Sequence, residues 1–138
     1  MSEQKRPPMV VTHDGGVKFT AQIRQHKVTV DQPLRGGGED SAPTPLELLG
    51  ASLGTCVAFY VQQFCQTRSL PYEGMQVEVD PEAVHGRVER FNVRVILPEV
   101  PPAQYGEMLE RVARSCPAHN TLTHGAEVSV VIEQPVAR

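Results

Sequence analysis

The stretch "TPLELLGASLGTCVAFYVQQFCQTRSLPYEG", residues 44–74, decides the fold of this chain. Thr44 fits the N-cap of a helix, Pro45 fits the first helical position, and Glu47 completes a capping box with Thr44. The segment "LPYEG" contains a proline and a glycine, which end helices. The pattern therefore predicts one long helix that begins at this capping box and ends near Arg68–Ser69.

This helix is expected to form the core of the protein. Between Glu47 and Arg68 it carries no charge, and its apolar side chains form a stripe along one face: Leu46, Leu49, Leu53, Val57, Tyr60 and Phe64. Glycines and glutamines interrupt the segment, and its apolar run is shorter than the roughly 20 residues that a membrane span needs. We therefore expect other elements to wrap the helix, and we expect no membrane as a partner.

The flanking segments predict strands and a second helix. Alternating apolar residues indicate a hairpin of strands over 17–23 and 26–30, with its turn at Arg24–Gln25. The same patterns predict strands over 75–79 and 91–95 with a connection over 81–86. They also predict an amphipathic helix that contains 105–112 and ends before Pro117, and a last strand over 127–133. This order of elements is typical of an α+β fold with mostly antiparallel sheets around a long central helix.

The composition fits one globular domain. The chain has 138 residues, of which 40% are hydrophobic, so it can bury one core. We expect a single domain over residues 1–138, with residues 1–10 as a flexible N-terminal segment. The net charge of -3 is spread without basic patches, which argues against nucleic acid as a partner. The polar N-terminus lacks the apolar segment of a secretory signal, so we expect a cytoplasmic protein.

Three cysteines raise the question of thiol chemistry, because reducing compartments disfavour structural disulfides. Cys56 and Cys65 lie on opposite faces of the predicted helix and about 13 Å apart along its axis, so they cannot bond to each other. Any intrachain disulfide must then use Cys116. Cys56 is its better partner, because Cys56 lies on the side of the main apolar stripe. Cys65 lies near the polar end of the helix and is expected to be a small buried hydrophobe.

Cys116 occurs in the segment "RSCPAHNTL", residues 114–122. Pro117 favours the first position of a short new helix, which makes Cys116 its N-cap residue. Backbone N–H groups and the helix dipole can stabilise a thiolate there, and His119 can exchange a proton near pH 7. From the residues alone, Cys56 and Cys116 are equally well explained as small buried side chains. Cys116 and His119 also form half of a zinc site, but the chain offers no matching second pair, so we expect no metal.

Two charged residues have simple structural explanations. The capping box accounts for Glu47 without a catalytic role. Lys18 lies on the predicted hairpin, where a charged side chain is normally solvated. Neither residue indicates a reaction by itself.

The segments "GGEDSAPTPLELLGASLGTC", residues 37–56, and "RSCPAHNTL" resemble the OsmC/Ohr family of cysteine-dependent hydroperoxide reductases. The resemblance spans most of the chain. It includes the glycine-rich loop, the helix start at Pro45, a cysteine in the helix and a second cysteine followed by proline. The form "CPAHNTL" is most similar to the less characterised OsmC-like branches.

The resemblance implies an OsmC-like fold, in which an intertwined homodimer wraps sheets from both subunits around two long central helices. It implies that Cys56 is the peroxidatic thiol and Cys116 the resolving thiol, so that a Cys56 sulfenic acid is captured as a disulfide. We therefore expect a thiol-dependent peroxidase that reduces organic hydroperoxides with an external dithiol reductant and no cofactor. Three apolar side chains are expected to line the substrate pocket: Leu49, Leu53 and Phe64.

One position departs from the family pattern. Well-studied members resemble each other in placing a glutamate directly after the helix-start proline, where it helps hold an arginine beside the peroxidatic cysteine. This chain has Leu46 there. Glu47 matches the next position only, and Lys18 is the nearest counterpart of the arginine, although lysine lacks the planar fork that holds a carboxylate bidentately. Two alternatives therefore stay open: a non-catalytic OsmC-like dimer that binds a small ligand or senses redox state, and a structural protein with inert thiols.

Overall fold

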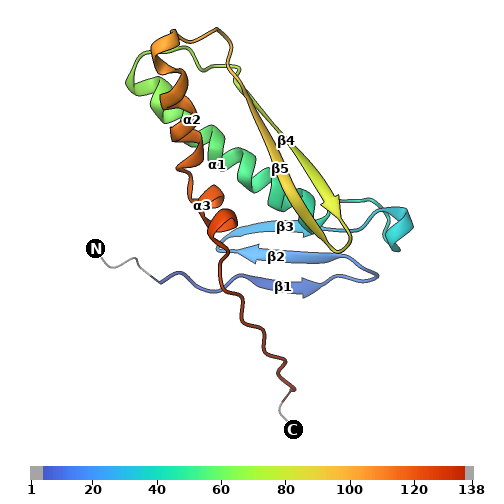
Figure 1. Cartoon of the computed structure of the whole chain (residues 1–138). Helices are drawn as coiled ribbons and strands as arrows, with labels where there is room; N and C mark the ends of the chain where they lie inside the picture. The colour runs from blue at the N-terminus through green and yellow to red at the C-terminus, as the bar shows by residue number, and fades with distance from the viewer. Residues whose placement is uncertain (1–4, 136–138) are drawn as a thin grey trace. The chain divides into compact units, whose positions relative to one another are not determined.

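The computed structural model describes residues 5–135. Three strands come first along the chain, followed by a long helix, two more strands and two shorter helices (Figure 1). The chain divides into two compact units. The first contains the described residues up to Ser52 together with Val79–Asn92, and the second contains Leu53–Glu78 together with the described residues from Val93 onward. The α+β fold is as predicted, while a single domain over the whole chain stays a prediction.

The first unit contains a three-stranded antiparallel sheet in the order β1-β2-β3 (Figure 1). The strands are β1 (Val10–His13), β2 (Phe19–Ile23) and β3 (His26–Val30). The predicted hairpin is confirmed, since Phe19 pairs with Val30 and Ile23 with His26 across a two-residue turn. Strand β1 was not predicted, because Val10 was assigned to the flexible segment 1–10. In the structure Val10 begins this strand and pairs with Gln22 of β2. Residues 1–4 of that segment lie outside the described residues.

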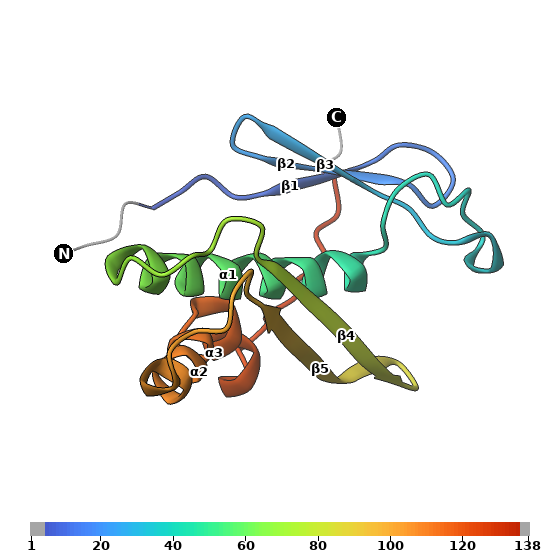
Figure 2. The ribbon, with the colours of Figure 1, turned by 90° about the horizontal axis from the view of Figure 1, so that it is seen from above.

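Helix α1 (Pro45–Thr67) runs unbroken, as Figure 2 shows. The predicted capping box is confirmed: the Thr44 N–H donates to Glu47 Oε1 at 2.9 Å, and the Glu47 N–H donates to Thr44 Oγ1 at 3.2 Å. Contrary to our expectation, α1 is long and apolar enough to cross a membrane by length and composition. It nevertheless carries five of the six buried hydrophobic side chains of the described residues, as a core helix does: Leu53, Val57, Val61, Phe64 and Cys65.

A long hairpin follows α1. Strand β4 (Gln76–Val84) and strand β5 (Arg87–Ile96) form a two-stranded sheet. The predicted connection over 81–86 was wrong, because β4 continues through Val84 and leaves only two residues for the turn. A proline at position 81 is compatible with this extension, since a strand with one neighbour leaves every second N–H unpaired.

The second unit also contains the C-terminal helices. After a 3-10 turn (Ala103–Tyr105), α2 covers Gly106–Arg114 and α3 covers Pro117–His124. Both lie beside the second half of α1 in the two ribbon views (Figures 1 and 2). The predicted amphipathic helix, which contains 105–112 and ends before Pro117, is therefore confirmed as α2.

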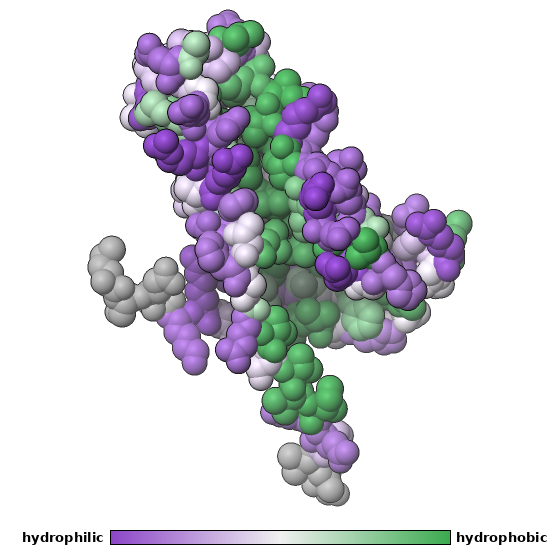
Figure 3. Space-filling view, viewed as in Figure 1, coloured by the Kyte–Doolittle hydropathy of each residue, from purple (hydrophilic) through white to green (hydrophobic). Residues whose placement is uncertain are grey.

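The predicted last strand over 127–133 was wrong for the described residues. This segment has no regular secondary structure, and its apolar side chains are exposed: Val128 is 80% exposed, Val130 78% and Ile132 87%. Figure 3 shows them as an uncovered apolar patch towards the end of the chain. An alternating pattern makes a strand only when a neighbouring strand pairs with it, and no described residue does so.

Candidate active site

The two cysteines that the sequence favours as a pair lie together in the second unit. Cys56 is half-buried in the middle of α1, and Cys116 is 0% exposed at the start of α3. The two thiols are near enough that Cys56 raises the pKa of Cys116, and neither forms a disulfide in this structure. Cys56 and Cys116 are therefore neighbours in the second unit.

Cys116 is held by the local structure that the sequence predicts. It has extended backbone angles at the N-cap of α3, and Pro117 follows it in the first turn. The His119 N–H donates to Cys116 Sγ at 3.2 Å. The thiol thus takes the place that a serine or aspartate oxygen usually has at a helix N-cap.

This cap does not make Cys116 a thiolate, which corrects our expectation. Burial is the largest influence and raises the pKa of the Cys116 thiol. The backbone N–H groups of His119 and Ala118 lower the pKa, while the hydrogen bond and charge of Cys56 raise it further, and the net direction is upward. Cys116 therefore keeps its proton at neutral pH.

His119 contributes more than its backbone. Its Nδ1 atom is buried and has no hydrogen-bond partner among the described residues. Leaving a polar atom buried and unpaired costs on the order of 1–3 kcal/mol. By contrast, His124 on the same helix is exposed, and its Nδ1 lies 2.9 Å from the main-chain oxygen of Asn120. The His119 ring therefore has a hydrogen-bonding capacity that the fold does not use.

Cys65 behaves as the predicted small hydrophobe. It is 0% exposed, and burial raises the pKa of its thiol. Its neighbour Phe64 is 6% exposed, with the Tyr105 ring edge-on at 5.8 Å and Arg68 Cζ 3.8 Å from the ring centre. Of the predicted pocket lining, Leu53 and Phe64 are thus core side chains, while Leu49 is 40% exposed in the first unit. A pocket lined by these three stays a prediction.

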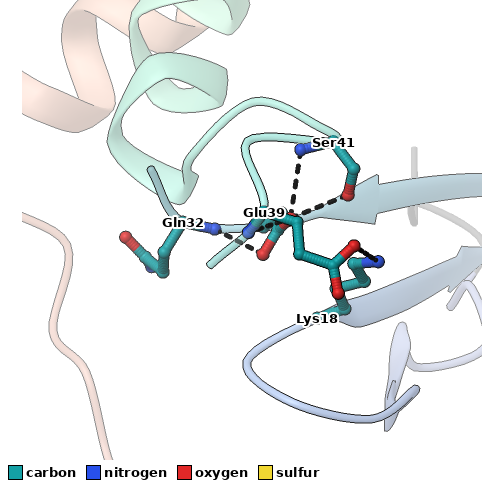
Figure 4. A network of polar contacts seen from close by, with 5 residues as sticks. Lys18, Gln32, Glu39 and Ser41 are labelled. Carbon is teal, nitrogen blue, oxygen red and sulfur yellow. Dashed lines mark hydrogen bonds and ion pairs between the residues drawn. The ribbon is translucent and has the colours of Figure 1, made fainter. Parts of the chain in front are cut away.

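Lys18 and Glu47 lie in the first unit, where each has a local partner. Lys18 Nζ donates to Glu39 Oε2 at 2.9 Å, and this hydrogen bond is the main reason that the pKa of Lys18 is raised (Figure 4). Glu47 is held by Thr44, whose hydrogen bonds lower the pKa of Glu47. The two residues that were expected to support Cys56 are therefore each engaged in another interaction.

Sequence reasoning missed Asp31, the only buried charged residue among those described. Its carboxylate accepts hydrogen bonds from the Gln32 and Glu39 N–H groups and from both the N–H and the hydroxyl of Ser41 (Figure 4). The Ser41 hydroxyl is the largest of these influences, and together they hold the pKa of Asp31 well below its usual range. The position directly before a glycine-rich loop was the one available signal.

The same loop packs too tightly for a side chain at one position. A Cβ atom at Gly38 would overlap the main-chain oxygen of Gln32 and approach Asp31 Oδ1 to 2.7 Å. At the neighbouring Gly37 a Cβ atom would meet no other atom within 4 Å, but the backbone φ there is positive, at 87°. Asp31 and these glycines together fix the loop that presents Glu39 to Lys18.

An α+β fold whose long central helix brings one cysteine to a second, helix-capping cysteine defines a class of proteins with a paired-thiol site. The family model described as OsmC-like protein matches residues 37–131. The chain belongs to this OsmC-like family, as the resemblance predicted.

Solved structures agree with this assignment. A Psychrobacter arcticus protein named for osmotic stress induction and detoxification response is 19% identical, with 88% of this chain and 91% of that chain covered and a TM-score of 0.77. An OsmC-like protein from Mycoplasma pneumoniae is 18% identical, with coverage of 89% and 91% and a TM-score of 0.73. An organic hydroperoxide resistance protein from Elizabethkingia anophelis is 19% identical, with coverage of 89% and 92% and a TM-score of 0.57. No curated protein matches the chain. At these identities the structures establish the fold alone.

Proposed function

We propose that this protein is a thiol-dependent peroxidase that reduces organic hydroperoxides, with Cys56 as the peroxidatic residue and Cys116 as the resolving residue. The observation that carries the proposal is that a half-buried thiol on α1 neighbours a fully buried thiol at the N-cap of α3. The name of the Elizabethkingia anophelis structure supports an organic hydroperoxide as the substrate class.

The proposed reaction has three steps. The Cys56 thiolate attacks the terminal oxygen of the hydroperoxide, the O–O bond breaks, and the alkoxide leaves as an alcohol after it takes a proton. The Cys116 sulfur then attacks the Cys56 sulfenic acid, so that an S–S bond forms, the S–O bond breaks, and water is released. An external dithiol reduces the disulfide by exchange and restores both thiols. No cofactor or metal takes part in this scheme.

The half-buried position of Cys56 fits the first of these roles. A peroxide must reach the peroxidatic sulfur, and of the three cysteines only Cys56 is not fully buried. Leu49, Leu53 and Phe64 remain the proposed lining for an apolar substrate. Lys18 remains the proposed source of positive charge for the thiolate, in competition with its bond to Glu39.

The test compares three single variants in a peroxide-consumption assay with a dithiol reductant. Cys56→Ser is expected to lose activity by roughly 100-fold or more, since it removes the attacking sulfur. Cys116→Ser is expected to leave the first oxidation intact and to let the Cys56 sulfenic acid persist. Cys65→Ala is the matched control on the same helix and should keep the wild-type rate. Equal rates in all variants would exclude the peroxidase.

We also propose that the protein is an intertwined homodimer in the cytoplasm. The exposed apolar segment that contains Val128, Val130 and Ile132 supports this, because a strand-forming pattern left without a neighbour is suited to pair with a second copy. Val130→Glu is expected to shift the mass measured by light scattering from dimer to monomer. Val131→Glu is the control, because an extended segment places position 131 on the opposite side. A monomeric wild type would contradict the proposal.

A second candidate is a redox-sensing or ligand-binding dimer without turnover. The observation that favours it is the Lys18–Glu39 salt bridge, which occupies the nearest counterpart of the family's activating arginine. A sensor would consume about one equivalent of hydroperoxide per thiol pair even with excess dithiol. A peroxidase would consume many equivalents, so the same assay separates the two functions.

A further inference from the structure

The resolving step needs a base, and the structure limits where that base can be. Cys116 is fully buried, so solvent does not reach its sulfur directly. Burial and the Cys56 thiol keep its proton in place despite two backbone N–H groups. A protonated thiol is a poor nucleophile, because the thiolate is the reacting form. The proton must therefore pass to a group inside the second unit.

His119 is the neighbour of Cys116 whose side chain has suitable chemistry. Its main-chain N–H contacts Cys116 Sγ at 3.2 Å, so the residue lies on the helical turn that covers the sulfur. Nδ1 is the ring nitrogen nearer the main chain, and here it is buried and unpaired among the described residues. In the tautomer that carries its proton on Nε2, this nitrogen is free to accept a proton. Imidazole is also the side chain that exchanges protons most readily near neutral pH.

We propose that His119 is the general base that takes the Cys116 proton as this sulfur attacks the oxidised Cys56. This proposal rests on the proposed function, since it assigns the second step of that reaction. As the S–S bond forms, the Cys56 S–O bond breaks and hydroxide leaves. His119 then passes its proton to the hydroxide, which departs as water, and the imidazole is neutral again. The role is separate from the cap, which uses only the main-chain N–H of His119.

A test without peroxide keeps this proposal distinguishable from the peroxidase. An aromatic disulfide that releases coloured thionitrobenzoate first modifies the accessible Cys56. Attack by Cys116 on the mixed disulfide then releases a second thionitrobenzoate. This second release requires the Cys116 proton to be removed, but it needs no hydroperoxide. All proteins in the test carry Cys65→Ala, so that only the two site thiols react.

His119→Gln is expected to keep the first release and to slow the second by at least roughly 10-fold at pH 7, the lower range for loss of a general base. At pH 9 a larger fraction of the Cys116 thiol is ionised before it attacks, so the step depends less on a base. The rate of the second release in His119→Gln should therefore approach the rate in the parent protein. His124→Gln is the matched control on the same helix and should behave as the parent protein. His119→Asn repeats the test with a shorter side chain in case glutamine perturbs the turn.

Two results would overturn the proposal. One is a second release at the parent rate in His119→Gln, which would show that no proton passes through the ring. The other is an equal slowing at pH 7 and pH 9, which would indicate a structural effect on α3 only. A protein that shows the expected pattern here but consumes no hydroperoxide would refute the peroxidase and keep the base.

Discussion

Asp31 and Cys116 are two fully buried groups that can become anions, and the structure treats them in opposite ways. Asp31 accepts four hydrogen bonds from three residues and has a lowered pKa. Cys116 is near two backbone N–H groups and a second thiol, and its pKa is raised. Burial opposes the charge at both sites, so the number and strength of the donors decide the outcome. One site holds a structural anion, and the other holds a thiol that keeps its proton at neutral pH.

The largest effect is expected from the removal of the anion. In Asp31→Asn, an amide that carries two hydrogens faces donors that need an acceptor, so the midpoint of thermal unfolding should fall by roughly 5–10 °C. Ser41→Ala is the control that removes the hydroxyl alone, and it should lose less than half as much. An unchanged midpoint in Asp31→Asn would mean that the four hydrogen bonds do not stabilise the fold.

The pH dependence of Asp31 follows from the same shift. Its pKa is lowered on folding, so its stabilisation is present above the unfolded value of about 3.9 and is lost as the pH falls through the folded value. Wild type should therefore lose stability between about pH 4 and pH 2. Asp31→Asn should lose less over this range in the same calorimetric measurement.

The thiol site should show the reverse dependence at alkaline pH. The pKa of Cys116 is raised on folding, so its stabilisation is fully present below the unfolded value of about 8.5 and is lost as the pH rises through the folded value. Urea unfolding under reducing conditions should show a lower stability at about pH 9.5 than at about pH 7.5. Cys116→Ala should cost about 1 kcal/mol at the lower pH and flatten this dependence. Burial also raises the pKa of Cys65, so Cys65 contributes to the same loss of stability at alkaline pH. Cys65→Ala should remove that contribution.

The N-cap of α1 is exposed to solvent, whereas the N-cap residue of α3, Cys116, is buried. Thr44→Ala removes the oxygen that accepts the Glu47 N–H, and urea unfolding should show a loss of about 1 kcal/mol. Thr44→Ser keeps the oxygen and is the control. A loss as large as that of Asp31→Asn would contradict the distinction between solvated and buried acceptors.

The smallest effect is expected at Lys18. Its salt bridge with Glu39 is largely exposed, since the Glu39 side chain is 75% exposed, and such pairs contribute little to stability. Lys18→Met should leave the thermal midpoint within about 2 °C. If Lys18 also supports the Cys56 thiolate, the same variant should react several-fold more slowly with hydroperoxide, whereas Glu39→Gln should react at least as fast as wild type. Equal rates in all three would remove Lys18 from the site.

Local patterns predicted the features that depend on a few neighbouring residues. The capping box of α1 and the N-cap at Cys116 each follow from a proline and one polar side chain, and both were confirmed. Helix geometry excluded a bond between Cys56 and Cys65, and the apolar stripe favoured Cys56 over Cys65 as the partner of Cys116. The raised pKa of Cys116 did not follow, because burial depends on residues that pack from distant parts of the chain.

Local sequence patterns did not predict features that depend on residues from a distant part of the chain. The alternation in 127–133 is real, but a strand also needs a neighbour, and the described residues supply none. The bond from Lys18 to Glu39 depends on the path of a glycine-rich loop, and that path depends on Asp31, whose burial has no periodic signature. A residue such as Asp31 is therefore recognised only once the fold of the loop is known.

The crowded glycine in the Asp31 loop has a practical consequence for protein engineering. A library randomised at Gly38 should return almost only glycine after selection for folded protein, because any side chain meets the main chain of Gln32. At Gly37 the backbone conformation is the only restriction, so asparagine and aspartate should also survive. Redesign of this loop must therefore change its length or its outer residues, and leave that single position alone.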